Sequence, residues 1–545
     1  MSPLLLLLVG MIIVIGGILA LRLHAFLALL LGALVVAGLT TNDQLLAHKL
    51  SSAAVPILAA GPDGLIVNPG KDQLLAPGAN RLLVEGKLLE PAVELAPPAR
   101  DHDDARRWVV RLVGTWPPGI DPAHAALIHA TAVTHALREA KAGTGERVSA
   151  AFGRTAAGVG IIIALAAIIG QCLMMSGAAD RVVLAMHRLL GDARAGQGFV
   201  ASGFLLCIPM FFETVFYLLL PLGKAMRRRT GRHYVLYVLS IVAGATMAHA
   251  LVPPTPGPSL VAAELNVNIG LMMLGGGAVG LISAGAGYLY ACWADRRWDI
   301  PLPAEEVAGA EVAVTAAASL PPLWLSLLPI LLPVLLIAGA AVAKMAIAPP
   351  LPGWADALLF WGDKHLALSL SAAVALGTLA WQRRSSRREL AATTQVAVTN
   401  AGGIILIIAA GGAFGGALQD TGIAEALARY LPAAKSALIP LAFLITSTIR
   451  IAQGSATVAM ITAVGIIAPL AAAGDLGYHP LYLALAIGCG SKPIPWMNDS
   501  GFWMIGRMSG FTEGQTFKTA SVMMSLMGVV GLIATMLGAW ILPLT

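Results

Sequence analysis

Long runs with almost no charge dominate this chain and limit what it can fold into. Residues 3 to 20, 155 to 179, 270 to 293, 320 to 343 and 515 to 545 are each long enough to cross a bilayer as a helix. The 545 residues are 57% hydrophobic and 12% charged, with a mean hydropathy of +0.79. We therefore interpret the chain as an all-α polytopic membrane protein with about ten to twelve membrane-embedded segments.

The basic residues predict how the chain is oriented. The positive-inside rule places basic clusters on the cytoplasmic side, so the segment between the first two clusters, residues 197 to 223, must enter and leave on one side as a re-entrant hairpin. The first apolar run lacks a basic n-region and a small-residue cleavage site, which favours a retained span. We expect a multi-pass protein of the inner (cytoplasmic) membrane. The clusters are residues 181 to 194, 224 to 232, 296 to 297 and 383 to 388.

Residues 41–148 differ in composition from the rest of the chain and follow two N-terminal helices predicted within residues 1–40. They are polar and rich in Pro, Gly and Asp. The stretches "RLLVEGKLLEPAVEL" and "RRWVVRLVGTW" predict short strands, and a helix is expected over about 121 to 142. We interpret this region as a small α+β extramembrane insertion on the extracytoplasmic (periplasmic) side. Its histidines, His124, His129 and His135, are expected to be solvated rather than metal ligands.

An internal repeat is the most informative pattern. Glycine-bounded segments recur at a nearly constant offset: Gly177 and Gly422 differ by 245, whereas Gly257 and Gly501, and Gly270 and Gly514, differ by 244. We predict two repeats, residues 149–295 and 395–545, separated by connecting helices and a cytoplasmic loop at 296–394. With the orientation above, the first repeat starts outside and the second inside. Inverted repeats with re-entrant hairpins and broken helices are typical of secondary transporters.

Two proline-containing interruptions lie at equivalent positions of these repeats. They are "HALVPPTPGPSL", residues 249–260, and "KPIPWMNDSGFW", residues 492–503. Proline interrupts a helix, and a break in hydrocarbon survives only against protein or a water-filled cavity. The helix that restarts after each break presents a partly positive N-terminus, which favours a carboxylate. A kink that serves only packing is the alternative, and pairing of Lys492 with Asp499 would also be structural.

Isolated ionisable groups mark the candidate transport path. Glu213 lies in the first predicted hairpin, where a carboxylate at a helix centre costs about 2.5 to 3.5 kcal/mol, so we favour a role in proton coupling. His249 is a second candidate. A hydrogen-bonded structural carboxylate and a core histidine remain the alternatives.

The second predicted hairpin, "STIRIAQGSATVAMITAVGIIAPL", carries Arg450, Gly454, Ser455 and Thr457. Thr457 follows Glu213 by 244 residues. The hydroxyls suit a polyhydroxylated ligand, and Arg450 could balance a carboxylate. A tight contact between helices through small residues is the competing interpretation.

Other classes of chemistry leave no pattern in the sequence. The four cysteines, Cys172, Cys207, Cys292 and Cys489, lie in apolar segments, which argues against a disulfide framework. We find no zinc, phosphate-loop or nucleophile motif, so we expect no enzyme activity, no metal, no cofactor and no nucleic-acid partner. The expected partners are the bilayer and a small anionic substrate, and a homo-oligomer is left open.

At these residues the chain resembles the gluconate:proton symporter (gluconate permease) family of the ion transporter superfamily. The matching stretches are "FFETVFYLLLPL", "HALVPPTPGPSLVAAELNVNIG", "RIAQGSATVAMITAVGIIAPL" and "WMNDSGFW". Members often carry a second histidine in the proline-rich break, where this chain has Thr255, and the insertion is absent from compact members.

The resemblance implies proton-coupled symport, that is, uptake of gluconate or a similar small hydroxylated carboxylate. A sodium-coupled carboxylate carrier and a D-serine or amino-acid permease are the alternatives, with H+ or Na+ as the coupling ion. A membrane enzyme or a ligand sensor is less favoured. The implied proton-coupling residues are Glu213 and His249, and the implied substrate-binding residues are Thr214, Pro254, Thr255, Gly257, Arg450, Gly454, Ser455, Thr457, Asn498 and Asp499.

Overall fold

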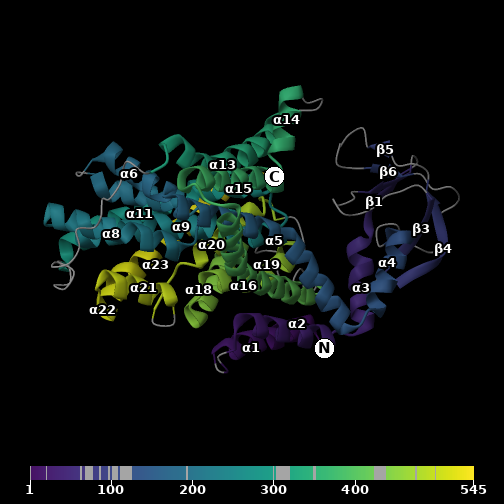
Figure 1. Cartoon of the computed structure of the whole chain (residues 1–545). Helices are drawn as coiled ribbons and strands as arrows, with labels where there is room; N and C mark the ends of the chain where they lie inside the picture. Colours follow the sequence, from purple (N-terminus) through teal and green to yellow (C-terminus); the bar gives the residue numbers. More distant parts are fainter. Residues whose placement is uncertain are drawn as a thin grey trace.

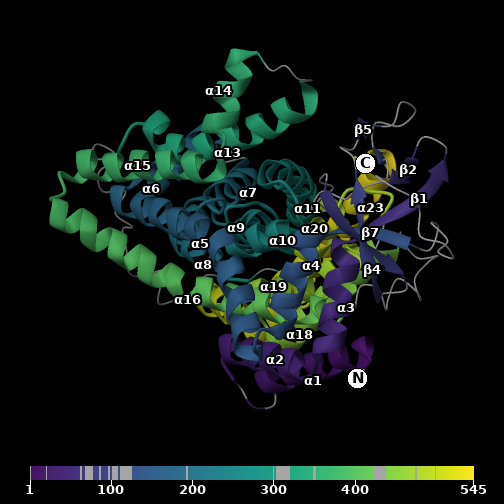
Figure 2. The same ribbon diagram turned by 90° about the vertical axis from the view of Figure 1, so that its right-hand side faces the viewer.

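A computed structural model of the chain shows a large helical part and a smaller lobe that holds the strands (Figures 1 and 2). In Figure 1 this lobe lies at the right, and α3, α4 and the start of α5 connect it to the helical part. The structure describes residues 2–544 apart from 20, 22, 62–63, 68–77, 85–86, 96–98, 101–107, 111–124, 192–193, 299, 302–319, 348–351, 423–436, 473–475 and 497–498.

The lobe contains one seven-stranded sheet in the order β4-β3-β7-β1-β2-β6-β5. Strand β7 lies inside the sheet and pairs antiparallel with both β1 and β3. Leu50 of α3, Ile128 of β7 and Val133 of α4 meet in a small apolar core that holds both helices against the sheet. The strands are β1 (Val55–Gly61), β2 (Gly64–Val67), β3 (Gly78–Val84), β4 (Lys87–Leu95), β5 (Ala99–Arg100), β6 (Trp108–Val110) and β7 (Ala125–His129).

The helix expected over 121 to 142 is wrong in its first half. Residues 121–124 lie outside the described residues, and Ala125–His129 form strand β7, so helix α4 starts only at Ala130. Backbone pairing on both sides of β7 satisfies its amides and carbonyls, which overrides the weak helical preference of this alanine-containing stretch. His129 then caps α4, because its Nδ1 accepts a hydrogen bond from the backbone N–H of Thr131.

Among the described residues, seven helices are long and apolar enough to cross a membrane, and a bent pair formed by α2 and α3 would make an eighth. The helices are α1 (Pro3–Leu19), α2 (Ala25–Leu39), α3 (Asn42–Ala53), α4 (Ala130–Lys141), α5 (Thr144–Ser176), α6 (Ala178–Leu190), α7 (Ala195–Leu206), α8 (Phe212–Thr230), α9 (Tyr234–Leu251), α10 (Pro256–Glu264), α11 (Ile269–Arg297), α13 (Leu323–Ala346), α14 (Gly353–Trp361), α15 (Lys364–Arg383), α16 (Arg387–Gln419), α18 (Leu438–Gln453), α19 (Ala456–Ala472), α20 (Leu481–Gly490), α21 (Ser500–Ser509), α22 (Glu513–Thr516), the π-helical turn η5 (Phe517–Ser521) and α23 (Val522–Ile541).

The helix boundaries repeat along the chain. The helices α8, α10 and α11 start at residues 212, 256 and 269, and α19, α21 and α22 start at 456, 500 and 513, which is 244 later in each case. The long helices α5 and α16 start at 144 and 387, an offset of 243. Apart from α6, whose equivalent positions mostly lie outside the described residues, the order of long helix, helix pair, broken helix and long helix therefore occurs twice.

Equivalent helices of the two halves pack against each other in opposite directions. Along α5, Ala151, Thr155 and Gly160 approach Gly416, Gly412 and Ile405 of α16 in turn, so residue numbers rise on one helix as they fall on the other. The final helices behave alike, because Ser283 and Gly287 of α11 approach Gly531 and Met527 of α23. The views in Figures 1 and 2 place α5 beside α16 in the helical part.

Helix α9 runs through the middle of the helical part and is buried along nearly its whole length. Two glycines permit this close packing. A Cβ on Gly244 would lie 2.1 Å from the Val200 carbonyl oxygen of α7, and one on Gly276 of α11 would lie 2.0 Å from the Leu251 carbonyl oxygen. Backbones that approach this closely leave no room for a side chain.

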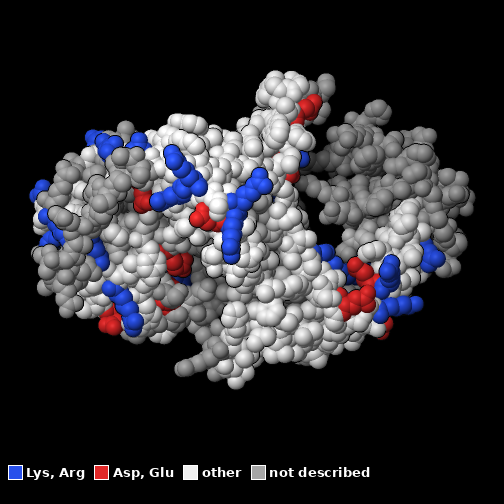
Figure 3. Space-filling view, in the orientation of Figure 1, with Lys and Arg blue, Asp and Glu red and all other residues white. Residues whose placement is uncertain are grey.

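Charged side chains form separate groups on the face of the helical part that Figure 3 shows. Lys and Arg lie at the left-hand end, formed by α6, α8 and α11, where Arg227, Arg228, Arg296 and Arg297 are located, and further charged side chains lie over the middle. Large uncharged areas remain between these groups, as expected for a surface that is partly covered by lipid.

An ion-pair bridge fastens the strand-containing lobe to the helical part. The Lys49 ammonium of α3 lies 3.1 Å from a Glu139 carboxylate oxygen of α4 and 2.9 Å from a carboxylate oxygen of Asp420, which caps the end of α16. Burial of Lys49 disfavours its charged form, but the carboxylates of Asp420 and Glu139 outweigh this effect and raise the pKa of Lys49. The bridge therefore joins α3, α4 and α16 at one point.

We expect Lys49→Met to loosen the lobe. The bridge is half-buried, so its loss should destabilise the docked arrangement by between about 1 kcal/mol, typical of exposed pairs, and about 3 kcal/mol, typical of buried ones. Hydrogen exchange should then become faster in α3 and α4. Lys141→Met, which removes an exposed lysine from α4, is the matched control. Equal exchange in both variants would show that the bridge does not hold the lobe.

Candidate functional site

Two broken helices contribute to the candidate site. Helix α9 ends at Leu251 and α10 starts at Pro256, while α20 ends at Gly490 and α21 starts at Ser500. Pro256 occupies the first turn of α10, where a missing N–H is tolerated. Asp499 caps α21, because its carboxylate accepts a hydrogen bond of 2.8 Å from the Gly501 N–H. Both restarting helices thus begin inside the protein.

Two hairpin tips face these breaks. Residues 207–211 connect α7 to α8, and Gly454 and Ser455 connect α18 to α19. Gly454 has φ of +87°, a left-handed conformation that glycine adopts readily, so the chain reverses here within two residues. The Ser455 hydroxyl then accepts a hydrogen bond from the Val458 N–H in the first turn of α19.

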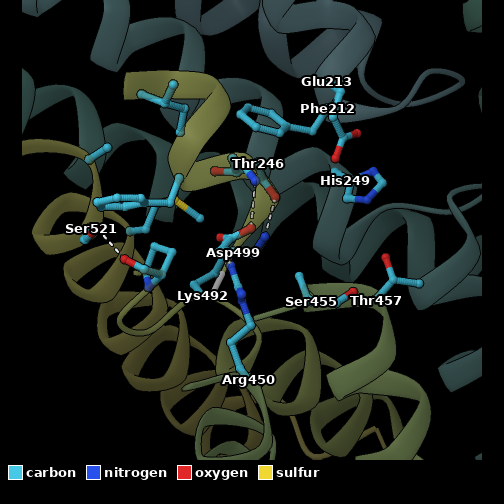
Figure 4. Close-up of a pocket in the computed structure, with 17 residues that line it drawn as sticks. Phe212, Glu213, Thr246, His249, Arg450, Ser455, Thr457, Lys492, Asp499 and Ser521 are labelled. Carbon is cyan, nitrogen blue, oxygen red and sulfur yellow. Dashed lines mark hydrogen bonds and ion pairs between the residues drawn. The ribbon is translucent and has the colours of Figure 1, made fainter. Parts of the chain in front are cut away.

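One pocket lies beside these breaks and tips, with an empty volume of about 640 Å³ that includes its opening to solvent (Figure 4). Its walls come from both halves of the chain, and they combine charged groups, hydroxyls and apolar side chains. Figure 4 shows Ser455 and Thr457 on one wall and the carboxylate of Glu213 pointing toward the His249 ring on another. The lining residues are Phe212, Glu213, Thr246, His249, Arg450, Ser455, Ala456, Thr457, Lys492, Pro495, Asp499, Gly501, Phe502, Ile505, Ala520, Ser521 and Met524.

Arg450 holds three segments of this site together. Its Nε donates to the Ser491 carbonyl at 3.0 Å, just beyond the end of α20. Its Nη1 donates to the Gly454 carbonyl at the hairpin tip, and its Nη2 pairs with the Asp499 carboxylate at the start of α21. Arg450 is only 2% exposed, so these partners replace the water that a buried guanidinium would otherwise need.

Lys492 occupies the second break and reaches across to the first. Its ammonium donates to the Thr246 carbonyl of α9 at 2.9 Å, and the residue is 2% exposed. The structure does not show the pairing of Lys492 with Asp499 that the sequence left open as an alternative, because Asp499 pairs with Arg450 of α18 instead. Lys492 instead connects the two broken helices.

Glu213 and His249 come from the first half of the chain. Glu213 lies in the first turn of α8, where the partial positive charge of the helix end favours a carboxylate. The His249 ring makes an edge contact with Phe211, with ring centroids 6.2 Å apart. Its Nδ1 is buried and has no hydrogen-bond partner among the described residues, which is unusual for a buried polar atom.

The structure brings together six of the predicted site residues, namely Glu213, His249, Arg450, Ser455, Thr457 and Asp499. Pro254, Thr255, Gly257 and Gly454 are buried in the break and the tip and do not line the pocket. Thr214 lines a different pocket with Gln171 and Asn400, because successive residues of α8 point to different sides. Asn498 lies outside the described residues.

Several lining residues were missed by the sequence analysis. Thr246 lies within an apolar helix, and Ser521 belongs to the π-helical turn η5, where its hydroxyl donates to the Pro495 carbonyl. No motif marks either residue. Lys492 was visible as an isolated charge two residues beyond α20, but its reach to α9 depends on the packing of the two halves.

Comparison with known proteins decides the family. The family model of the GntP family permeases matches residues 121–541. The chain belongs to the GntP permease family. The family predicted from the sequence is thus confirmed, and the match leaves α1, α2, α3 and six of the seven described strands outside it.

Several curated relatives are similar over most of their length. The gluconate permease of Pseudomonas aeruginosa is 33% identical over 392 residues, which cover 71% of this chain and 85% of the relative. The low-affinity gluconate transporter of Escherichia coli K12 is 30% identical, with coverages of 71% and 86%. The Gnt-II system L-idonate transporter of the same organism is 28% identical, with coverages of 70% and 86%. These relatives are permeases and transporters rather than enzymes.

A solved structure shares the fold. The Alcanivorax borkumensis YdaH transporter matches with a TM-score of 0.54 and 16% identity, covering 79% of this chain and 94% of that chain. At this identity the likeness concerns the fold alone. This GntP family permease is therefore a multi-pass membrane transporter with a largely helical fold.

The geometry predicts a large effect of Asp499→Asn on stability. The substitution leaves the Arg450 guanidinium buried without its counter-charge, and breaking a buried pair in this way costs about 3 to 5 kcal/mol. The double variant Arg450→Gln, Asp499→Asn should recover part of this loss. Thermal unfolding of the purified protein in detergent measures both, with Asp356→Asn, an exposed change on α14, as control. An Asp499→Asn variant as stable as the control would contradict the assigned pairing.

Proposed function

We propose that this GntP family permease is a proton-coupled symporter that takes up gluconate or a similar small hydroxylated carboxylate across the cytoplasmic membrane. Two relatives named for gluconate transport match more than two thirds of the chain, which supports this substrate class. The pocket adds the chemistry that such a ligand needs, with cationic groups for a carboxylate and the hydroxyls of Ser455 and Thr457 for a polyol chain.

Charge balance in the pocket is the observation that carries the proton coupling. Among the described lining residues, Arg450 and Lys492 are cationic and Glu213 and Asp499 are acidic, so the formal charges cancel. Because Asp499 is paired with Arg450, Glu213 is the carboxylate that can change its charge without breaking that contact. A proton on Glu213 leaves one net positive charge, which an anionic substrate neutralises. Proton and anion then enter the low-dielectric site together.

We further propose that the two halves are inverted repeats. The antiparallel packing of α5 on α16 and of α11 on α23 supports this, since equivalent helices of inverted repeats cross the membrane in opposite directions. Residues 149–295 and 395–545 would form the repeats, and the helices of residues 296–394 would connect them. In alternating access, the pocket between the repeats opens to each side in turn.

The same topology assigns the remaining segments. The basic clusters would face the cytoplasm. They lie at the starts of α6 and α16 and at the ends of α8 and α11. The α5 start and the α16 end would then face the other side, and Lys49 fastens the strand-containing lobe at that end. We therefore propose that residues 41–148 form an extracytoplasmic insertion after the helices of residues 1–40.

Uptake into proteoliposomes tests the proposed function. An imposed pH gradient should drive accumulation of labelled gluconate, and an imposed sodium gradient alone should not. Glu213→Gln should abolish accumulation but leave exchange of internal for external gluconate, because the variant site keeps a fixed charge. Glu389→Gln, on the exposed start of α16, is the matched control.

Three results would overturn parts of this proposal. Uptake driven only by a sodium gradient would show that the coupling ion is sodium and not the proton. Undiminished accumulation by the Glu213→Gln variant would show that this residue does not carry the proton. Stronger uptake of D-serine than of any sugar acid in a competition panel would replace the substrate class.

A further inference from the structure

We propose that Lys492 binds the carboxylate of the substrate and that Arg450 is a positioning residue that does not contact it. This inference rests on the proposed function, because it assigns a part of the same pocket. The sequence pattern favoured Arg450 as the carboxylate partner, since a guanidinium is suited to carboxylates. The contacts of the two cations reverse that assignment.

Arg450 already serves a protein acceptor with each of its nitrogens, and its charge is already neutralised by Asp499. Its Nε, Nη1 and Nη2 each donate to a protein acceptor, and these acceptors are the Ser491 carbonyl, the Gly454 carbonyl and the Asp499 carboxylate. One N–H on each of Nη1 and Nη2 remains, but a substrate carboxylate could take over the charge of Arg450 only by displacing Asp499, a second carboxylate, from a buried ion pair. That exchange gains no charge and would release the capping residue of α21.

Lys492 has N–H donors that are free for a ligand among the described residues. An ammonium carries three N–H donors, and among the described residues that of Lys492 makes one hydrogen bond, to the neutral Thr246 carbonyl. The residue lines the pocket and is buried, so an anionic ligand would meet its charge with little screening by water. The closeness of α23 holds the stem in place, because a Cβ on Gly528 would lie 3.2 Å from the Lys492 Cβ.

The position of Lys492 would also set the orientation of the substrate in the pocket. Its ammonium lies between the two broken helices, whereas the hydroxyls of Ser455 and Thr457 come from the hairpin tip on another wall (Figure 4). A carboxylate on Lys492 would place the adjoining hydroxylated carbons toward that tip. The site then selects an acid that carries hydroxyls beyond its carboxylate, and substrate binding engages α9 through the Thr246 contact.

Competitive binding to the purified protein tests this assignment with two ligands of one shape, gluconate and its neutral amide, gluconamide. Wild type should bind gluconate at least tenfold more tightly. Lys492→Met should lose this preference, so that both ligands bind with similar affinity. Lys518→Met, which removes the same charge from an exposed residue of the adjoining turn η5, should keep it. If Lys492 had only a structural role, its loss would weaken the binding of both ligands by the same factor, and the ratio of the two affinities would stay unchanged.

The double variant Arg450→Gln, Asp499→Asn provides the second test, since it removes an ion pair without changing the net charge. It should still prefer gluconate over gluconamide, even if both bind more weakly. The proposal is overturned if Lys492→Met keeps the preference, or if the double variant loses it. A wild-type protein that binds neither ligand would instead contradict the proposed function.

Discussion

A helix that breaks inside a membrane leaves carbonyls and amides that must find partners within the protein, and Arg450 supplies two of these partners at this site while it pairs with the cap of the restarting helix. Its guanidinium contacts the end of α20, the tip between α18 and α19, and the cap of α21. These segments belong to different helices, and all three contact the same side chain. Because unpaired polar groups in hydrocarbon cost several kcal/mol, the pocket depends on this interaction.

The two halves repeat in structure but differ in chemistry. At the offset of 244, Arg450 corresponds to Leu206, Lys492 to Ala248 and Asp499 to Thr255, whereas Glu213 corresponds to Thr457. The second half therefore supplies the fixed ion pair and the ammonium, and the first half supplies the carboxylate and the histidine. The carboxylate of the first half can be neutralised by a proton, whereas the charges of the second half stay fixed. This difference suits the coupled entry of a proton and an anion.

Much of this arrangement could be predicted from the sequence because proline, glycine and isolated charge act locally. The breaks after Leu251 and Gly490, the reversal at Gly454 and the offset of the repeats all follow from such residues. What could not be predicted depends on tertiary contacts. The strand at Ala125–His129 forms because two neighbouring strands pair with it. Asp499 pairs with Arg450 and not with Lys492, because the hairpin tip packs against the break.

The central claim is that the pocket lies between two inverted repeats, and cysteine labelling of intact cells tests it most directly. In a variant without the four native cysteines, Gly145→Cys and Arg388→Cys place single thiols at the exposed starts of α5 and α16. A maleimide that cannot cross the membrane should label Gly145→Cys in intact cells and Arg388→Cys only after permeabilisation. Labelling of both thiols from the same side would contradict the inverted arrangement.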